Sequence, residues 1–201
     1  MSTADRVLHA AMVAFGGRGY DATSLDDLAV ELGIRKQSIL YHFPSKDLLL
    51  DAVVDQAVGE LTAVLWDVVA TSDDGWERVD AMVRGVFRLA MRRPELLGLL
   101  REVTRLGPPV LIRATDSLDP LIKGATEWLA GEMEAGRVRR SDPRLLAFSV
   151  YSTVMGVATE IEVLRAVGVE PTLREAAVRR RELLRFLHSA LQPAGLDSGA
   201  S

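Results

Sequence analysis

Apolar residues recur every three or four positions along most of this chain, which is the spacing of helices that bury one face. Runs that alternate as strands do are few, so we expect an all-α protein of about nine helices. Besides two short helices between 24 and 43, the spacing predicts helices over about 4–17, 45–70, 76–92, 94–106, 110–136, 143–166 and 172–191, followed by a flexible tail over 192–201.

The helix over 4–17 carries an apolar face that should pack against the segment after it. Three glycines stand at or just beyond its end and predict a loose terminus, namely Gly16, Gly17 and Gly19. Tyr20 should then turn the chain back onto the next two helices. We interpret this first helix as scaffold.

The stretch 23–46 predicts two short helices joined by a tight turn. Ser24 followed three residues later by Asp27 is a capping box, and Gly33 ends the first helix because glycine adopts the left-handed conformation easily. The second helix runs over about 35–43. This is the layout of a helix–turn–helix, whose second helix enters the major groove of DNA. An ordinary helical hairpin has the same spacing, so spacing alone leaves both interpretations open.

Basic residues stand where a helix least favours them. Arg35 and Lys36 lie in the first turn of the second helix, and Lys46 lies in the first turn of the third. A cation there opposes the helix dipole and costs roughly 0.3–1 kcal/mol. Docked phosphates reverse that cost, since the N–H groups at a helix start also point outward. The arrangement therefore indicates nucleic-acid contact, with ordinary solvated surface charge as the alternative.

The runs FGGRGYDATSLDDLA and GIRKQSILYHFPSKDLL resemble the tetracycline-repressor (TetR) family of bacterial transcription regulators. The match covers about the first fifty residues, and the start DPRLLAFSV of a later helix is also typical of the family. The resemblance implies a three-helix DNA-binding domain over 1–46, with its motif over about 24–43 and its recognition helix over about 35–43. An effector-binding and dimerisation domain would follow over 47–191.

The resemblance also implies which residues meet double-stranded DNA. Thr23 or Ser24 would touch a phosphate, and Gln37 would read adenine through two hydrogen bonds unless it is merely an exposed helical glutamine. Lys36, Gln37 and Ser38 would face the groove, while Tyr41, His42 and Lys46 would hold the backbone. The full predicted DNA-binding set is Thr23, Ser24, Arg35, Lys36, Gln37, Ser38, Leu40, Tyr41, His42 and Lys46.

Two positions depart from the family pattern. Arg35 stands where the family usually has a capping serine, which costs about 1 kcal/mol of cap and adds a charge facing the DNA backbone. Leu40 replaces a tyrosine that is common there. A leucine contacts a thymine methyl group but forms no hydrogen bond, so the operator sequence cannot be taken from relatives.

The helix over 143–166 is apolar on too much of its circumference for one neighbour. One face should serve the subunit core through Phe148, Tyr151, Val154, Met155, Ala158 and Ile161. A second stripe would join the last helix in a four-helix homodimer interface, which suits a palindromic operator. The alternative is that both helices pack within one subunit. The residues predicted at the interface are Ser149, Thr153, Gly156, Glu160, Leu184 and Leu187.

Family members usually hold a small molecule among their C-terminal helices. Binding would change the separation of the two DNA-reading units through the long helix over 45–70. We expect an apolar or aromatic effector, although plain core is the alternative for every candidate. The candidate lining residues are Trp66, Phe87, Met91, Thr104, Trp128, Tyr151 and Met155.

Composition narrows the function classes. The chain has no cysteine, three scattered histidines and no catalytic or phosphate-binding motif, so we expect neither an enzyme nor a metal or cofactor. No apolar run reaches membrane-spanning length and no signal peptide is evident, which predicts a cytoplasmic protein. The net charge is −4, and the first 46 residues balance five basic against five acidic side chains, so any DNA contact depends on arrangement. We predict a transcriptional repressor, with a helical interaction module whose DNA face has degenerated as the alternative.

Overall fold

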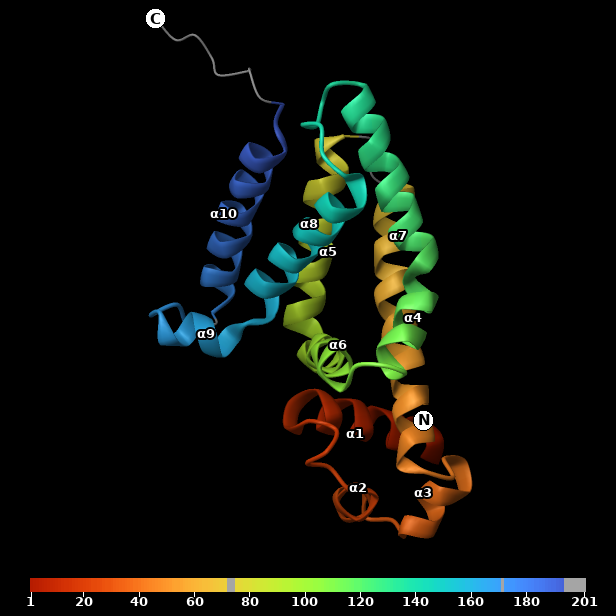
Figure 1. The fold of residues 1–201 in the computed structure, drawn as a ribbon. Coiled ribbons are helices and arrows are strands. Elements are labelled where there is room, and N and C mark those ends of the chain that lie inside the picture. The colour runs from red at the N-terminus through yellow and green to blue at the C-terminus, as the bar shows by residue number, and fades with distance from the viewer. Residues whose placement is uncertain (72–74, 171, 194–201) are drawn as a thin grey trace, which may run out of the picture. The chain divides into compact units, whose positions relative to one another are not determined.

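The computed structural model describes residues 1–71, 75–170 and 172–193, and over these residues it contains ten helices and no strand (Figure 1). The predicted all-α fold is confirmed. In chain order the helices are α1 (Thr3–Arg18), α2 (Leu25–Leu32), α3 (Lys36–His42), α4 (Lys46–Thr71), α5 (Trp76–Arg92), α6 (Pro94–Leu106), α7 (Val110–Glu134), α8 (Pro143–Thr159), α9 (Ile161–Ala166) and α10 (Leu173–Leu191). The predicted tail over 192–201 lies almost entirely outside the described residues. None of the described helices is long and apolar enough to cross a bilayer.

The chain forms two compact units. The first contains Met1–Ala63 and Leu89–Leu118, and the second contains Val64–Arg88 and the chain from Asp119 onward. Helices α4, α5 and α7 each contribute to both units. The boundary predicted at residue 46 separates a DNA-binding domain from an effector-binding domain, and it stays a prediction.

Local sequence signals explain where the helices of the first unit begin and end. Ser2 with Asp5 and Ser24 with Asp27 form complete capping boxes at the starts of α1 and α2. Gly33 ends α2 with a left-handed φ of 66°, as its position predicted. These bonds satisfy N–H and C=O groups that a helix end would otherwise leave unpaired.

Helices α1 and α6 cross at a pair of glycines. A Cβ atom added to Gly98 would lie 2.4 Å from the carbonyl oxygen of Gly16, and one added to Gly16 would lie 2.3 Å from the carbonyl oxygen of Glu95. The predicted loose end of α1 is therefore wrong at Gly16, where the two backbones touch. Gly17 meets nothing within 4 Å. The sequence showed only a cluster of glycines, because their partner lies 82 residues away.

The second unit includes an apolar cluster formed by Leu129, Met133, Val138, Leu146 and Leu191, with Trp76 and Trp128 packed against it. As predicted, α8 begins at Pro143, and Asp142 caps it because its carboxylate accepts hydrogen bonds from two N–H groups. The single helix predicted over 143–166 is wrong, because it breaks at Glu160. There ψ is 59°, and α9 begins at the next residue.

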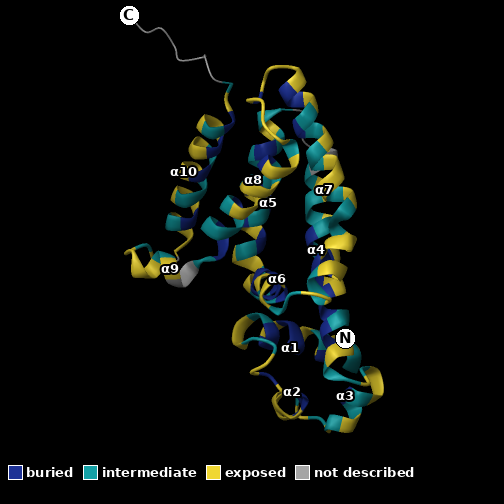
Figure 2. Cartoon of the chain, viewed as in Figure 1, coloured by how far each residue is buried: buried dark blue, intermediate teal, exposed yellow. Residues whose placement is uncertain are grey.

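Burial corrects the predicted faces of α8 and α10 (Figure 2). Phe148 and Tyr151, which we predicted in the subunit core, are 65% and 52% exposed, whereas Val154 and Ala158 are buried as expected. Leu187, which we predicted at a dimer interface, is 2% exposed because α8 and α10 pack against each other within the subunit. Two exposed aromatic side chains of α8 therefore lie on the face that was predicted to be in the core.

Candidate nucleic-acid interface

Helix α3 buries one side and exposes the other. Ile39 is fully buried, while Gln37, Tyr41 and His42 are exposed, with Tyr41 at 84%. Ser38 and Leu40 are half-buried on the flanks. Gln37 and Tyr41 thus point away from the core, and α3 offers a polar surface anchored by a single buried isoleucine.

The start of α3 has no side-chain cap. Arg35 occupies the N-cap position with extended backbone, and its side chain bonds to none of the α3 N–H groups. The guanidinium is exposed and forms no hydrogen bond or ion pair within the described residues. The predicted loss of the cap is therefore confirmed, and this helix start presents N–H donors beside a free cation.

Lys36 has an acidic partner that the order of residues did not reveal. Its Nζ lies 2.7 Å from Oδ2 of Asp26, in the first turn of α2, and both side chains are partly exposed. No acid stands between Glu31 and Asp47 in the chain, but the turn at Gly33 brings an earlier acid alongside. Lys36 is thus neutralised in the free protein, which Arg35 is not.

Lys46 is held by an aromatic ring. Its Nζ lies 3.9 Å from the ring centroid of Tyr20, and the Tyr20 hydroxyl donates a hydrogen bond to the Asp47 carboxylate. Burial and that carboxylate raise the pKa of Tyr20, so the phenol stays protonated. Ser45 caps the start of α4, because its hydroxyl oxygen accepts the Leu48 N–H at 3.1 Å.

Thr23 is only 1% exposed, and its hydroxyl donates to the Gly19 carbonyl at 2.9 Å. This burial contradicts a phosphate contact by its side chain, because a nucleotide cannot reach it. Ser24 is exposed, although its hydroxyl already bonds with Asp27 in the capping box. Of the two residues, only Ser24 stays a candidate.

A carboxylate of α6 holds the turn that precedes α2. Glu102 accepts the Tyr20 N–H at 2.7 Å and two hydrogen bonds from Arg105 at 2.8 Å, and Arg105 also pairs with Asp21 at 2.9 Å. The side chain of Glu102 is 11% exposed, and Arg105 lowers its pKa below the ordinary glutamate value. Tyr20 therefore contacts both α6 and the start of α4. Sequence reasoning missed Glu102 because nothing local marks a carboxylate that bonds across 82 residues.

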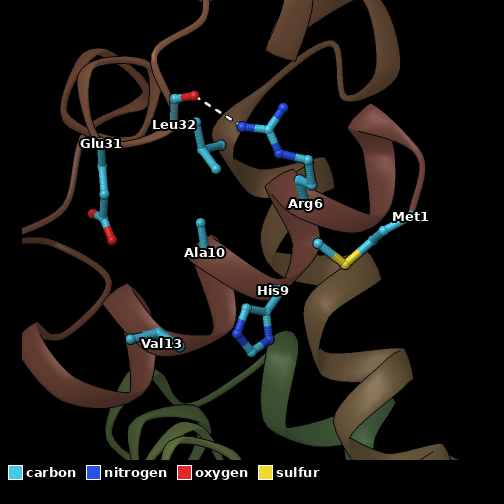
Figure 3. A pocket seen from close by; sticks show the side chains of 7 residues that line it. All are labelled: Met1, Arg6, His9, Ala10, Val13, Glu31 and Leu32. Carbon is cyan, nitrogen blue, oxygen red and sulfur yellow. Dashed lines mark hydrogen bonds between the residues drawn. The ribbon is translucent and has the colours of Figure 1, made fainter.

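A pocket of about 360 Å³ opens between α1 and α2 (Figure 3). Arg6 lies along its rim and donates to the Leu32 carbonyl at 3.0 Å, at the end of α2. The pocket contains no residue predicted to bind the effector, and no group of acids and histidines in the described chain is arranged to hold a metal ion. Its lining residues are Met1, Arg6, His9, Ala10, Val13, Glu31 and Leu32.

The residues predicted for an effector pocket are divided between the two compact units. Met91 and Thr104 belong to the first unit, and the other five belong to the second. Phe87 is buried, Trp66 and Tyr151 are about half exposed, and Met155 is half-buried. Trp128 is the most suggestive of them, because its Nε1 is buried without a hydrogen-bond partner in the described chain.

Known proteins are similar to this chain over the segment that contains these helices. The model of a family described as bacterial regulatory proteins, tetR family, matches residues 7–53, which include all of α2 and α3. The transcriptional regulator RutR of Escherichia coli K12 is 27% identical over 172 residues, covering 84% of this chain and 79% of RutR. Residues 7–53 are thus a TetR-family DNA-binding segment. The chain is therefore a DNA-binding transcriptional regulator, and the cations at the starts of α3 and α4 lie within the matched segment.

Two further comparisons show where the similarity is concentrated. IcaR of Staphylococcus aureus (strain Newman), a negative regulator of a biofilm operon, is 40% identical over 50 residues, which are 25% of this chain and 27% of IcaR. A transcriptional regulator from Saccharomonospora viridis, solved in complex with choline, aligns with a TM-score of 0.74 and 21% identity over 94% of this chain and 96% of that one. The fold is thus shared over nearly the whole chain.

Proposed function

We propose that this TetR-family regulator represses transcription by occupying a palindromic operator, from which a small molecule releases it. The start of α3 supports DNA binding, because the exposed side chains of Arg35 and Gln37 lie beside backbone N–H groups that no side chain caps. Phosphates bind such N–H groups and guanidinium groups. Repression requires only occupancy of the operator, and IcaR is itself named a negative regulator. The proposal implies that the protein acts in the cytoplasm, where a bacterial chromosome lies.

The exposed residues around α3 divide into two proposed roles. Gln37 reads an adenine through two hydrogen bonds, a contact worth about 1–3 kcal/mol of discrimination, while Ser38 and Leu40 contact neighbouring base edges. The other group holds the phosphate backbone and sets the register of α3 in the groove. It consists of Ser24, Arg35, Tyr41, His42 and Lys46, while Lys36 faces the groove beside Gln37.

A homodimer supplies the second half-site. The exposed aromatic residues Phe148 and Tyr151 of α8 and Phe186 of α10 support an interface built on these two helices. Large apolar side chains that stay exposed in one subunit gain stability when a second copy covers them. The predicted stripe of Ser149, Thr153, Gly156, Glu160 and Leu184 stays part of this proposal, while Leu187 is used within the subunit.

The second unit is the proposed effector site. Trp128 supports it, because a buried indole N–H without a partner is costly and a ligand with an acceptor atom relieves that cost. Trp66, Phe87, Tyr151 and Met155 belong to the same unit. The neighbour from Saccharomonospora viridis binds choline, which supports a small organic effector.

The direct test of the DNA-binding proposal compares three variants on duplexes that the protein selects from a random library. Lys46→Ala should weaken binding to every sequence and lower the slope of log K against log salt by about 0.9, since one phosphate contact is lost. Gln37→Ala should also relax the choice at one base pair. The matched control is Lys123→Ala, because Lys123 lies in the second unit and pairs with Asp119.

Unchanged binding in both Lys46→Ala and Gln37→Ala would contradict the assigned DNA-facing surface. A wild-type protein that selects no sequence would instead favour the alternative, an interaction module with a degenerate DNA face. Binding should be followed by fluorescence anisotropy at several salt concentrations.

A further inference from the structure

The basic side chains of the first 46 residues are mostly engaged within the free protein. Arg6 donates to the Leu32 carbonyl, Arg18 pairs with Glu31 at 3.2 Å, and Lys46 lies on the Tyr20 ring. Among them, Lys36 is the one that is both predicted to face the groove and held by an acid. Its partner Asp26 is 67% exposed, so the pair lies on the surface rather than in the core.

We propose that Asp26 is a specificity determinant, because it competes with DNA for the Lys36 ammonium. This inference rests on the proposed function, since it requires that α3 meets the groove. A phosphate bound to the same Nζ would lie near the Asp26 carboxylate, and the two anions would repel each other. DNA binding therefore gains a full Lys36 contact only where the pair with Asp26 is broken.

The ion pair between Lys36 and Asp26 should break on the operator but persist on DNA of random sequence. At the operator the base contacts of α3 fix its register, so Lys36 is held against a nucleotide and leaves Asp26. On random sequence the protein has no fixed register, and Lys36 stays neutralised by Asp26. Random DNA thus loses one of its few cationic contacts, and the ratio of specific to non-specific affinity rises.

The cap of α2 does not depend on this carboxylate, whose remaining structural contribution is a favourable position near the helix N-terminus. The capping box is formed by Ser24 with Asp27, so the start of α2 keeps its cap without Asp26. Asp26 accepts a hydrogen bond only from Lys36 within the described chain. Neutralising Asp26 therefore removes the competitor and leaves the helix–turn–helix folded.

The experiment measures Asp26→Asn on two duplexes of equal length, one selected by the wild-type protein and one of random sequence. Affinity for the random duplex should rise roughly two- to fivefold, the range expected for an exposed ion pair. The salt slope on that duplex should steepen by about 0.9. Affinity and slope on the selected duplex should change less, so the specificity ratio should fall.

Two controls separate competition for Lys36 from a general loss of negative charge. Glu31→Gln neutralises an exposed acid of the same helix that pairs with Arg18 instead, and it should leave the specificity ratio unchanged. In a Lys36→Met background, Asp26→Asn should no longer alter random-sequence binding. Thermal unfolding checks that every variant folds.

Each result decides between the inference and the function on which it rests. If Asp26→Asn matches wild type, if Glu31→Gln reproduces its effect, or if the effect persists in the Lys36→Met background, the inference is wrong. A wild-type protein that binds neither duplex with salt dependence overturns the proposed DNA-binding function and, with it, the inference.

Discussion

The crossing of α1 and α6 in the first unit differs in kind from the packing of α8 and α10 in the second. At the first crossing the backbones meet through Gly16 and Gly98, and the surrounding leucines of α6 are buried. In the second, Leu183 and Leu187 are buried, yet Phe148 and Phe186 stay 65% and 58% exposed. The first contact is complete within one chain, whereas the second leaves apolar surface for another molecule to cover.

The strongest test of this contrast is Gly98→Ala. The new Cβ would lie 2.4 Å from the Gly16 carbonyl oxygen, so the helices must separate, and we expect a loss of about 3 kcal/mol in the free energy of unfolding. Urea denaturation measures the loss. The matched control Gly17→Ala meets nothing within 4 Å and should stabilise the helix by about 0.5–1 kcal/mol. Equal effects of the two substitutions would refute the close crossing.

Phe148→Asp tests the open surface of the second unit. A charge on this exposed face should raise the dimer dissociation constant about thirtyfold, or 2 kcal/mol, because the carboxylate would be buried against a second copy. Sedimentation equilibrium measures the constant. Ile112→Asp is the control, since Ile112 is 55% exposed but belongs to the first unit. If both variants stay dimeric, the exposed aromatic residues of α8 do not form the dimer interface.

Glu102→Gln tests the hydrogen bonds by which the Glu102 carboxylate of α6 holds Tyr20 and Arg105. The pKa of Glu102 is lowered because Arg105 bonds to the ionised carboxylate, so that carboxylate stabilises the folded state above the ordinary glutamate pKa of 4.5. The variant should lose about 1.5 kcal/mol at neutral pH. The difference from wild type should shrink as the pH falls below 4.5 through the lowered pKa. Unfolding curves at pH 7 and pH 3.5 measure this trend.

Glu134→Gln, at an exposed position near the end of α7, provides the comparison for Glu102→Gln. It should change the free energy of unfolding little at either pH. A difference between Glu102→Gln and wild type that stays constant with pH would mean that the charge of Glu102 contributes nothing to the contact.

The smallest expected effect concerns α3, where stability and function should change in opposite directions. Arg35→Ser supplies the missing cap and should stabilise the protein by about 1 kcal/mol. The same change removes an unpaired cation and should weaken DNA binding. Thermal unfolding and anisotropy on one preparation measure both effects. If stability and affinity rise together, Arg35 does not contact the DNA backbone.

Local signals predicted the helix ends and the outward side of α3. Ser24 with Asp27, Gly33 and Asp142 all lie where the sequence placed them, because a cap forms between residues that are two to four positions apart. Ile39 is buried and Gln37 is exposed for a similar reason, since helical spacing alone separates the two sides of a short helix.

Contacts between distant segments could not be predicted in this way. The apolar spacing of α8 showed that two faces needed covering, but it assigned Phe148 and Tyr151 to the wrong one. Periodicity gives the angle between side chains on one helix, and it carries no information about which face a neighbouring helix approaches. The break at Glu160 was missed because no proline or glycine marks it.

The amino-acid sequence by itself determined the helical fold, its caps and the family to which the DNA-binding segment belongs, because each depends on residues close together in the chain. Only the tertiary structure decided that Asp26 neutralises Lys36, that Glu102 holds the Tyr20 turn and that Gly16 touches Gly98. These contacts join residues 10 to 82 positions apart, and chain folding, rather than local spacing, brings such residues together.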